Sequence, residues 1–202
     1  PAIPNTDTPV RAGDLKYKDL NNDGVIDDFD KSAIGKPNLP TTSLGWTLGA
    51  NWKGFSLSVL FQGSFDYSFS VVGTGIESFK SQFQPVHTKR WTLERFENGE
   101  EIDFPRLTTI PSTVNSAQGY MSDFWLINAW YIRLKTIDFA YQIPSRVLPR
   151  NINTARLYVN AYNLLTFTNY NKYQQDPEIS TNTAGDAYMN QRVFNLGIQL
   201  TF

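Results

Sequence analysis

The feature that most restricts the fold of this chain is a strict alternation of apolar and polar side chains over long segments. Residues 191–202, "QRVFNLGIQLTF", show it most clearly. Because successive side chains of a β-strand point to opposite faces, this period of two predicts a strand with one apolar face. The apolar face carries Phe194, Leu196, Ile198, Leu200 and Phe202, and the other carries Val193, Asn195, Gly197, Gln199 and Thr201.

The same alternation recurs in four earlier segments, 44–52, 54–67, 124–144 and 155–165. The short stretch "NWKG" joins the first two and indicates a hairpin. Within 130–143 the apolar positions change phase, and a β-bulge near Lys135 and Thr136 would reconcile the two halves. We expect about six strands in an all-β, antiparallel fold.

The connections between these segments are of two kinds. Residues 68–122 and 166–190 are long, polar segments, whereas "PSRVLPRN" at 144–151 is short. Most connections in compact domains have about 4–6 residues. Short turns at one end of the strands and long loops at the other are typical of an outer-membrane β-barrel.

Alternation is also found in soluble β-sandwiches, so other features must decide between the two. A strand of 12 residues, at about 3.4 Å per residue and tilted near 45°, spans roughly 25–30 Å, the thickness of a bilayer core. The polar face is rich in Ser, Thr, Asn, Gln and Gly, and the last strand ends on Phe202. Aromatic residues stand near strand ends, as expected at membrane interfaces: Trp46, Trp52, Tyr67 and Trp130.

Six strands are fewer than the roughly eight of the smallest bacterial barrels. An incomplete barrel leaves two open edges, which lipid cannot satisfy. The alternatives are that two strands lie within the long loops, or that this chain is the end of a larger barrel.

Composition excludes several classes of protein. With 18 Lys+Arg against 19 Asp+Glu, nucleic-acid binding has no electrostatic support. The absence of cysteine excludes disulfides and thiolate sites, and the single histidine, His87, excludes a His-rich zinc site. We interpret His87 as a surface or loop residue. No apolar run is long enough for a transmembrane helix, and the first residues do not resemble a signal peptide.

We expect no enzymatic activity. Glu94 and Glu97 are the pair of carboxylates that could be considered for a glycosidase. Nothing in the sequence fixes their separation, and a solvated charged loop is the favoured interpretation.

The stretch "DLNNDGVIDDFD", residues 19–30, is the candidate metal site. It matches the D-x-[DN]-x-[DN]-G pattern, in which oxygen ligands surround Ca²⁺ and glycine permits the sharp turn. The twelfth position is Asp rather than the usual Glu, and the preceding "RAGDLKYK" does not predict a helix, so we expect an isolated loop. The alternative is a set of Asx turns without an ion. The expected ligands are Asp19, Asn21, Asp23, the carbonyl of Val25, Asp27 and Asp30.

Four stretches together resemble one protein family. They are "GDLKYKDLNNDGVIDDFDKSAIGKPNLP", "RWTLERFENGEEIDFPRL", "SDFWLINAWYIRLKTIDFAYQIP" and "RLYVNAYNLLTFTNYNKYQQDPE". In this order they are similar to motifs near the C-terminus of the SusC/RagA-type TonB-dependent outer-membrane transporters of Bacteroidetes. The resemblance spans nearly the whole chain.

The resemblance implies a barrel of about 22 strands with a plugged lumen, of which this chain supplies about the last six. Residues 1–43 would be a loop segment containing the calcium-type loop. Residues 44–202 would be barrel strands with extracellular loops 68–122 and 166–190. The plug and the N-terminal strands would belong to the remainder of the transporter, and the location would be the bacterial outer membrane.

The resemblance also implies uptake of oligosaccharides or peptides with a SusD-like surface lipoprotein, energised by TonB acting on the part of the transporter outside this chain. The alternative function is a secreted, calcium-stabilised β-sandwich that binds carbohydrate. Loop aromatics could stack on sugars or pack within the loops: Trp91, Phe96, Tyr120, Tyr170 and Tyr173. Polar-face charges could form barrel-wall ion pairs: Asp66, Arg133 and Arg156.

Overall fold

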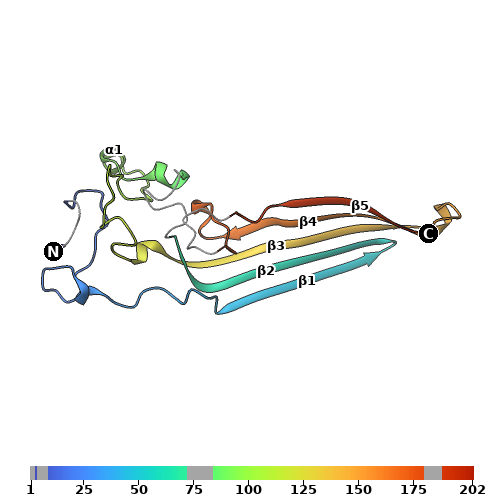
Figure 1. Ribbon diagram of the computed structural model, residues 1–202, viewed down its shortest axis with the longest axis horizontal. Coiled ribbons are helices and arrows are strands. Elements are labelled where there is room, and N and C mark those ends of the chain that lie inside the picture. The colour runs from blue at the N-terminus through green and yellow to red at the C-terminus, as the bar shows by residue number, and fades with distance from the viewer. Residues whose placement is uncertain (1–2, 4–8, 72–83, 180–187) are drawn as a thin grey trace.

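The computed structural model describes residues 3, 9–71, 84–179 and 188–202. These residues form a single antiparallel sheet in the order β1-β2-β3-β4-β5 (Figure 1). The fold is therefore all-β, as predicted. The strands are β1 (Thr42–Trp52), β2 (Phe55–Ser70), β3 (Leu126–Ile143), β4 (Thr154–Thr168) and β5 (Val193–Thr201).

The strands number five in the described residues, whereas the sequence predicted about six. The segment 124–144 contributes one continuous strand of 18 residues, β3, preceded by a 3-10 turn at Asp123–Trp125. Strand β2 extends to Ser70, into the segment expected to be a loop from residue 68. The single sheet also differs from the two packed sheets that the β-sandwich alternative requires.

The two ends of the sheet differ in their connections (Figure 1). Lys53 and Gly54 join β1 to β2 with φ values of 47° and 90°. Both are positive, which is the backbone conformation of a two-residue type I′ hairpin. The β3–β4 connection is a single 3-10 turn at Ser145–Val147 with its flanking residues. We call this the turn end, and we call the opposite end, where the long connections lie, the loop end.

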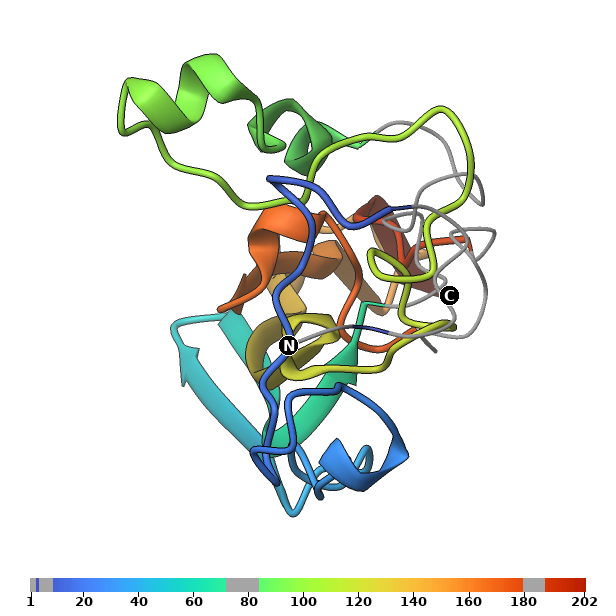
Figure 2. The ribbon, with the colours of Figure 1, turned by 90° about the vertical axis from the view of Figure 1, so that its left-hand side faces the viewer.

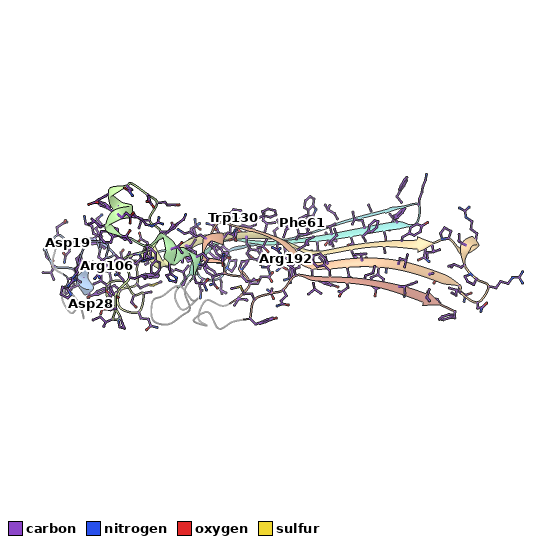
Figure 3. All side chains as sticks on the ribbon, turned by 90° about the horizontal axis from the view of Figure 1, so that it is seen from above. Asp19, Asp28, Phe61, Arg106, Trp130 and Arg192 are labelled. Carbon is purple, nitrogen blue, oxygen red and sulfur yellow. The ribbon has the colours of Figure 1, made fainter. Side chains whose placement is uncertain are left out.

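One face of the sheet is apolar across all five strands. The register aligns Leu48, Val59 and Ile137 in one row. A neighbouring row runs from Phe139 through Val159 to Leu196, the last of which is 81% exposed. Aromatic pairs extend this face toward the loop end, with ring centroids of Trp46 and Phe61 6.2 Å apart. Figure 3 labels Phe61 and Trp130 on this part of the sheet.

The opposite face carries polar and small side chains, most of them neutral. In register order, Ser58 pairs with Asp138, Asp138 with Asn160, and Asn160 with Asn195. The Asn195 and Asn160 side chains are hydrogen-bonded, with 2.9 Å between Nδ2 and Oδ1. The described part of the chain therefore has one face suited to lipid and one suited to water.

Three β-bulges bend the sheet. The predicted one is present: Leu60 pairs with Thr136 and Phe61 with Leu134, so Lys135 is the extra residue. The other two occur near Asp66 and Asn163, which have φ values of 61° and 53°. At such positions the strand twists more strongly and the side chains are redirected. Between these bulges and the loop end, side chains of β2 and β3 become part of the packed core.

The remaining regular elements are short. They are the 3-10 turns Asp28–Asp30, Pro85–Lys89 and Asn171–Tyr173 and the helix α1 (Leu93–Glu97). Among the described residues there is no helix with the length and apolarity needed to cross a membrane.

Candidate functional site

The loop end forms a packed unit of its own. Figure 2, which views the molecule from this end, shows the segment before β1 and the long connections gathered in front of the strands. Their centre is a cluster of buried side chains that includes Trp125 and Tyr170, both 0% exposed. The Phe69 and Tyr170 rings stack with centroids 4.4 Å apart, and the Tyr67 and Tyr170 hydroxyls are 3.1 Å apart. Burial raises the pKa of Tyr170.

The burial of the loop aromatics shows which of them pack inside the loops. Tyr170 and Tyr173 are buried and pack within the loops, Trp91 and Tyr120 are half-buried, and Phe96 is 65% exposed. His87 lies in the long loop, as expected, but it is not a surface residue. It is 3% exposed, and its ring meets the edge of Phe104 at 4.6 Å between centroids.

An ion pair joins the two long connections to each other. Lys172, after β4, contacts Asp103, between β2 and β3, at 2.7 Å, and Lys89 lies 3.5 Å from the same carboxylate. The hydrogen bond from Lys172, with the charge of Lys89 beside it, lowers the pKa of Asp103. The two connections therefore behave as one unit rather than as independent loops.

The segment before β1 is tied to the same unit. The Asp14 carboxylate, 2% exposed, contacts Arg106 at 2.6 Å and accepts a hydrogen bond from the Asn115 side chain at 2.7 Å. The Tyr17 hydroxyl donates to the carbonyl of Val114 at 2.8 Å, and burial raises the pKa of Tyr17 to about 12. Figure 3 labels Arg106, Asp19 and Asp28 at this end of the molecule.

The most buried charge lies where the polar face meets the loops. Arg133, 3% exposed on β3, contacts Asp176 at 3.0 Å and Glu178 at 2.8 Å. Lys135 reaches the same Glu178 oxygen at 2.6 Å, as does the Asn190 amide at 2.9 Å. Because these charges compensate one another, the group is neutral while it holds residues 176–178 against the sheet.

The three predicted polar-face charges thus all form ion pairs. Only Arg156 pairs within the sheet, with Asp138 at 3.2 Å. Arg133 pairs with the segment after β4, and Asp66 pairs with Lys36 from the segment before β1. No local pattern marks Asp176, Glu178 or Lys36 as partners, because each lies some 30 residues or more from its partner in sequence.

A cavity of about 540 Å³ lies between the ends of β2 and β3 and the two segments fastened by these ion pairs. Its walls include Asn38, Tyr67, Tyr131 and Glu178, together with apolar side chains of Leu39 and Ile179. Lys36 and Glu178 add charged groups to the hydroxyl, amide and apolar groups of the wall, so the cavity offers both hydrogen-bonding and apolar contacts to a polar solute.

The acidic loop 19–30 is exposed at the far side of this unit. Asp19 accepts hydrogen bonds from the backbone of Asn22 at 2.6 Å and Gly24 at 2.9 Å. Gly24 has φ 88°, which the sharp turn requires and which glycine tolerates best. Asp30 closes the loop by accepting from the backbone of Leu20 at 2.6 Å and of Asp27 at 2.9 Å. The backbone donors of Asp27 and Leu20 lower the pKa of Asp30.

The other predicted ligands have similar partners. Asp23 accepts from the Val25 backbone at 2.8 Å, and Asn21 accepts from the Asp23 backbone at 3.0 Å. Asp27 accepts from the Phe29 backbone at 2.8 Å. The Asx turns of the alternative interpretation are therefore present. Within the described ranges, no three acidic or histidine side chains converge closely enough to hold a metal ion as they stand. The carboxylate and amide oxygens remain the donor type that Ca²⁺ prefers.

Comparisons with known proteins agree with this architecture. The chain is 27% identical to TonB-dependent receptor P3 of Formosa agariphila over 202 residues, covering 92% of this chain and 19% of the receptor. It is 29% identical to TonB-dependent receptor P26 of the same organism over 213 residues, covering 96% of this chain and 20% of the receptor. The chain matches no family model.

Two solved structures share the fold at 26% identity. The RagAB peptide transporter matches with a TM-score of 0.57 over 86% of this chain and 19% of that chain. The RagAB peptide importer in its 'open-open' state matches with a TM-score of 0.59 over 88% and 19%. The chain thus spans about one fifth of the length of these relatives. The relatives are receptors and transporters rather than enzymes.

The antiparallel sheet, its two contrasting faces and the similarity over nearly the whole chain all point the same way. The chain resembles one part of the β-barrel of the SusC/RagA-type TonB-dependent transporters of the bacterial outer membrane.

Proposed function

We propose that this chain forms part of the wall and outer loops of a transporter that imports nutrients across the outer membrane. The observation that carries the proposal is the pairing of an exposed apolar face with a polar face that ends in a packed loop unit. Among the described residues, β1 and β5 each have a partner strand on one side only. In a membrane both free edges need further strands, which the remainder of the transporter would supply.

The proposed cargo is a peptide or an oligosaccharide. The RagAB neighbours are named as peptide transporters and importers, which favours a peptide. The polar face and the cavity beside Glu178 offer hydrogen-bonding groups of the kind that either cargo needs. A SusD-like surface lipoprotein and TonB are the proposed partners. TonB would act on the remainder of the transporter, outside this chain.

Uptake by the bacterium that carries the whole transporter tests this proposal. We expect deletion of the transporter to abolish uptake of a subset of labelled peptides or oligosaccharides, and restoration of the whole protein to recover it. Disruption of TonB should have the same effect as deletion. Unchanged uptake of all labelled peptides and oligosaccharides after deletion would contradict the proposal.

We also propose that the loop 19–30 binds Ca²⁺. Its support is the number and spacing of oxygen donors, and the turns already formed by the Asp19 and Asp30 hydrogen bonds. Binding would draw the carboxylates inward and neutralise part of their mutual repulsion. Its role would be to stiffen the segment that Asp14 and Tyr17 fasten to the loop unit.

A further inference from the structure

The cavity of about 540 Å³ at the loop end lies on the polar side of the sheet. Ser64 and Tyr131 in its wall face each other in register, two positions from the pair Gln62 and Arg133 and therefore on the same face. Glu178 lies on that face too, because it contacts Arg133 at 2.8 Å. The polar face of a barrel wall lines the interior, so the cavity lies beside the path of an imported cargo.

The charged groups in the wall of this cavity are already compensated. Lys36 forms an ion pair with Asp66. Glu178 contacts Arg133 at 2.8 Å and Lys135 at 2.6 Å. A charged group that entered the cavity would therefore lose its water without gaining a free counter-charge, which is unfavourable. The cavity favours an uncharged ligand.

The hydroxyl groups and aromatic rings of the wall are engaged or buried. The Tyr67 hydroxyl is 3.1 Å from that of Tyr170, and the Ser64 and Tyr131 side chains are both buried. An oligosaccharide needs a partner for each hydroxyl that loses water, and the described wall has few to give. The rings of Tyr67, Phe69 and Tyr131 are also buried, so they offer no open face on which a sugar ring can stack.

The apolar side chains of the wall, by contrast, are open to a ligand. Leu39 is 74% exposed, Pro40 is exposed, and Pro177 and Ile179 are half-buried. The first two belong to the segment before β1, and the other two to the segment after β4 that Arg133 holds against the sheet. An apolar group placed between these segments removes apolar surface of both from water, which is favourable.

We propose that this cavity receives an apolar side chain of an imported peptide. The inference rests on the proposed import function and narrows its cargo to peptides. The side chain would lie against Leu39 and Ile179, and the amide groups on either side of it would bond to the exposed Asn38 side chain. A volume of about 540 Å³ lies within the range of about 300–1,000 Å³ that is usual for ligand pockets, so it holds a large side chain with its flanking backbone.

Binding of two peptide libraries to the full-length transporter in detergent tests the inference. Both libraries are uncharged heptapeptides with blocked ends. One carries Leu, Ile, Val or Phe at its three central positions, and the other carries Ser, Thr, Asn or Gln there. We expect the apolar library to bind about tenfold more tightly, because burial of a large apolar side chain is favourable. Maltohexaose, an uncharged oligosaccharide, should not displace it.

Variants of two wall residues locate the binding. Leu39→Asn and Ile179→Asn replace an apolar side chain by a polar one, and each should weaken binding of the apolar library by about fivefold or more. Binding of the polar library should not change. Leu93→Asn and Ile110→Asn are the matched controls, because they make the same changes at exposed loop-end positions outside the cavity wall. They should leave the binding of both libraries unchanged.

Equal affinity for the two libraries, displacement of the apolar library by maltohexaose, or equal losses in the control variants would each overturn the proposal. A lowered Tm of Leu39→Asn with unchanged peptide binding would also overturn it, because another part of the transporter would then fill the cavity.

Failure of this inference is distinguishable from failure of the proposed import function. If deletion of the transporter abolishes uptake of oligosaccharides alone, import stands and the peptide cavity is wrong. If the apolar library binds at Leu39 but deletion leaves all uptake unchanged, the cavity stands and the import function is wrong.

Discussion

The turn end and the loop end of this molecule are stabilised in opposite ways. Near the turn end, side chains such as Trp52 and Leu196 face outward, and the sheet has no core on its apolar side within the described residues. At the loop end, Trp125 and Tyr170 are fully buried, and ion pairs link segments far apart in sequence. One part of the chain relies on lipid to cover its apolar surface, and the other makes a core as a soluble domain does.

Apolar content alone therefore says little about where a core lies. Leu196 and Trp125 are both large and apolar, yet they are 81% and 0% exposed. Leu196 alternates with polar neighbours along its strand and lies on the membrane face. Trp125 is enclosed by residues that are distant in sequence. Mutations should therefore affect the two ends differently.

Replacing Trp125 should have the largest effect. We expect Trp125→Ala to destabilise the loop unit by about 3–5 kcal/mol, because it removes a fully buried ring. The exposed Leu196→Ala should cost far less in detergent. Hydrogen exchange of the full-length transporter measures both, and faster exchange in the loops with unchanged exchange in β1 would support the separation. Equal effects of the two variants would contradict the proposed difference between the two ends.

Replacing the buried Arg133 should have the second-largest effect on stability. Arg133→Met leaves Asp176 and Glu178 without their main partner, which costs about 3–5 kcal/mol when a buried pair loses one member. Lys135→Met, whose side chain is 30% exposed, is the matched control and should cost less. Limited proteolysis at residues 169–192 reports release of this segment. Similar protection in both variants would show that the ion pairs do not hold it.

Acid should loosen the tie between the two connections. The folded pKa of Asp103 lies below its usual value of 3.8, so its contribution is present above that value and is lost as pH falls through the lowered pKa. We expect exchange near Asp103 and Lys172 to rise below about pH 4. In Asp103→Asn this rise should be absent. A rise of the same size in the variant would assign the acid sensitivity to other groups.

Calcium should have the smallest and most local effect. Ca²⁺ should slow exchange in residues 19–30, and Asp23→Ala should reduce both the affinity and this protection, because it removes one ligand. The exposed Asp28, which is not among the expected ligands, provides the control variant Asp28→Ala. Unchanged calcium titration and exchange in Asp23→Ala would leave the loop as a set of Asx turns.

Local pattern predicted much of the sheet. The alternation located all five strands, the "NWKG" hairpin and the bulge at Lys135, because each depends on neighbouring residues. It did not reveal the bulges at Asp66 and Asn163, since a bulge within a stretch of mixed side chains leaves no clear change of phase. It also did not show that β2 continues to Ser70, beyond its predicted end at residue 67.

The loop end was far less predictable. Its aromatic residues could equally have been ligand contacts, and only the structure places Tyr170 and Tyr173 in a core. The partners Arg133 and Glu178 are 45 residues apart, and Asp103 and Lys172 are 69 apart. Such pairs depend on how the strands bring the loops together. The calcium ligands were chosen from spacing, and their occupancy stays a prediction.

The most direct test of the account asks which face of the sheet touches lipid. Spin labels can be attached at Leu196→Cys and Asn195→Cys in the full-length transporter within a bilayer, and this chain contributes no cysteine of its own that would be labelled as well. The label at 196 should be relaxed by oxygen dissolved in lipid, and the label at 195 by a water-soluble nickel complex. Equal access of the nickel complex to both positions would contradict a membrane-facing apolar surface.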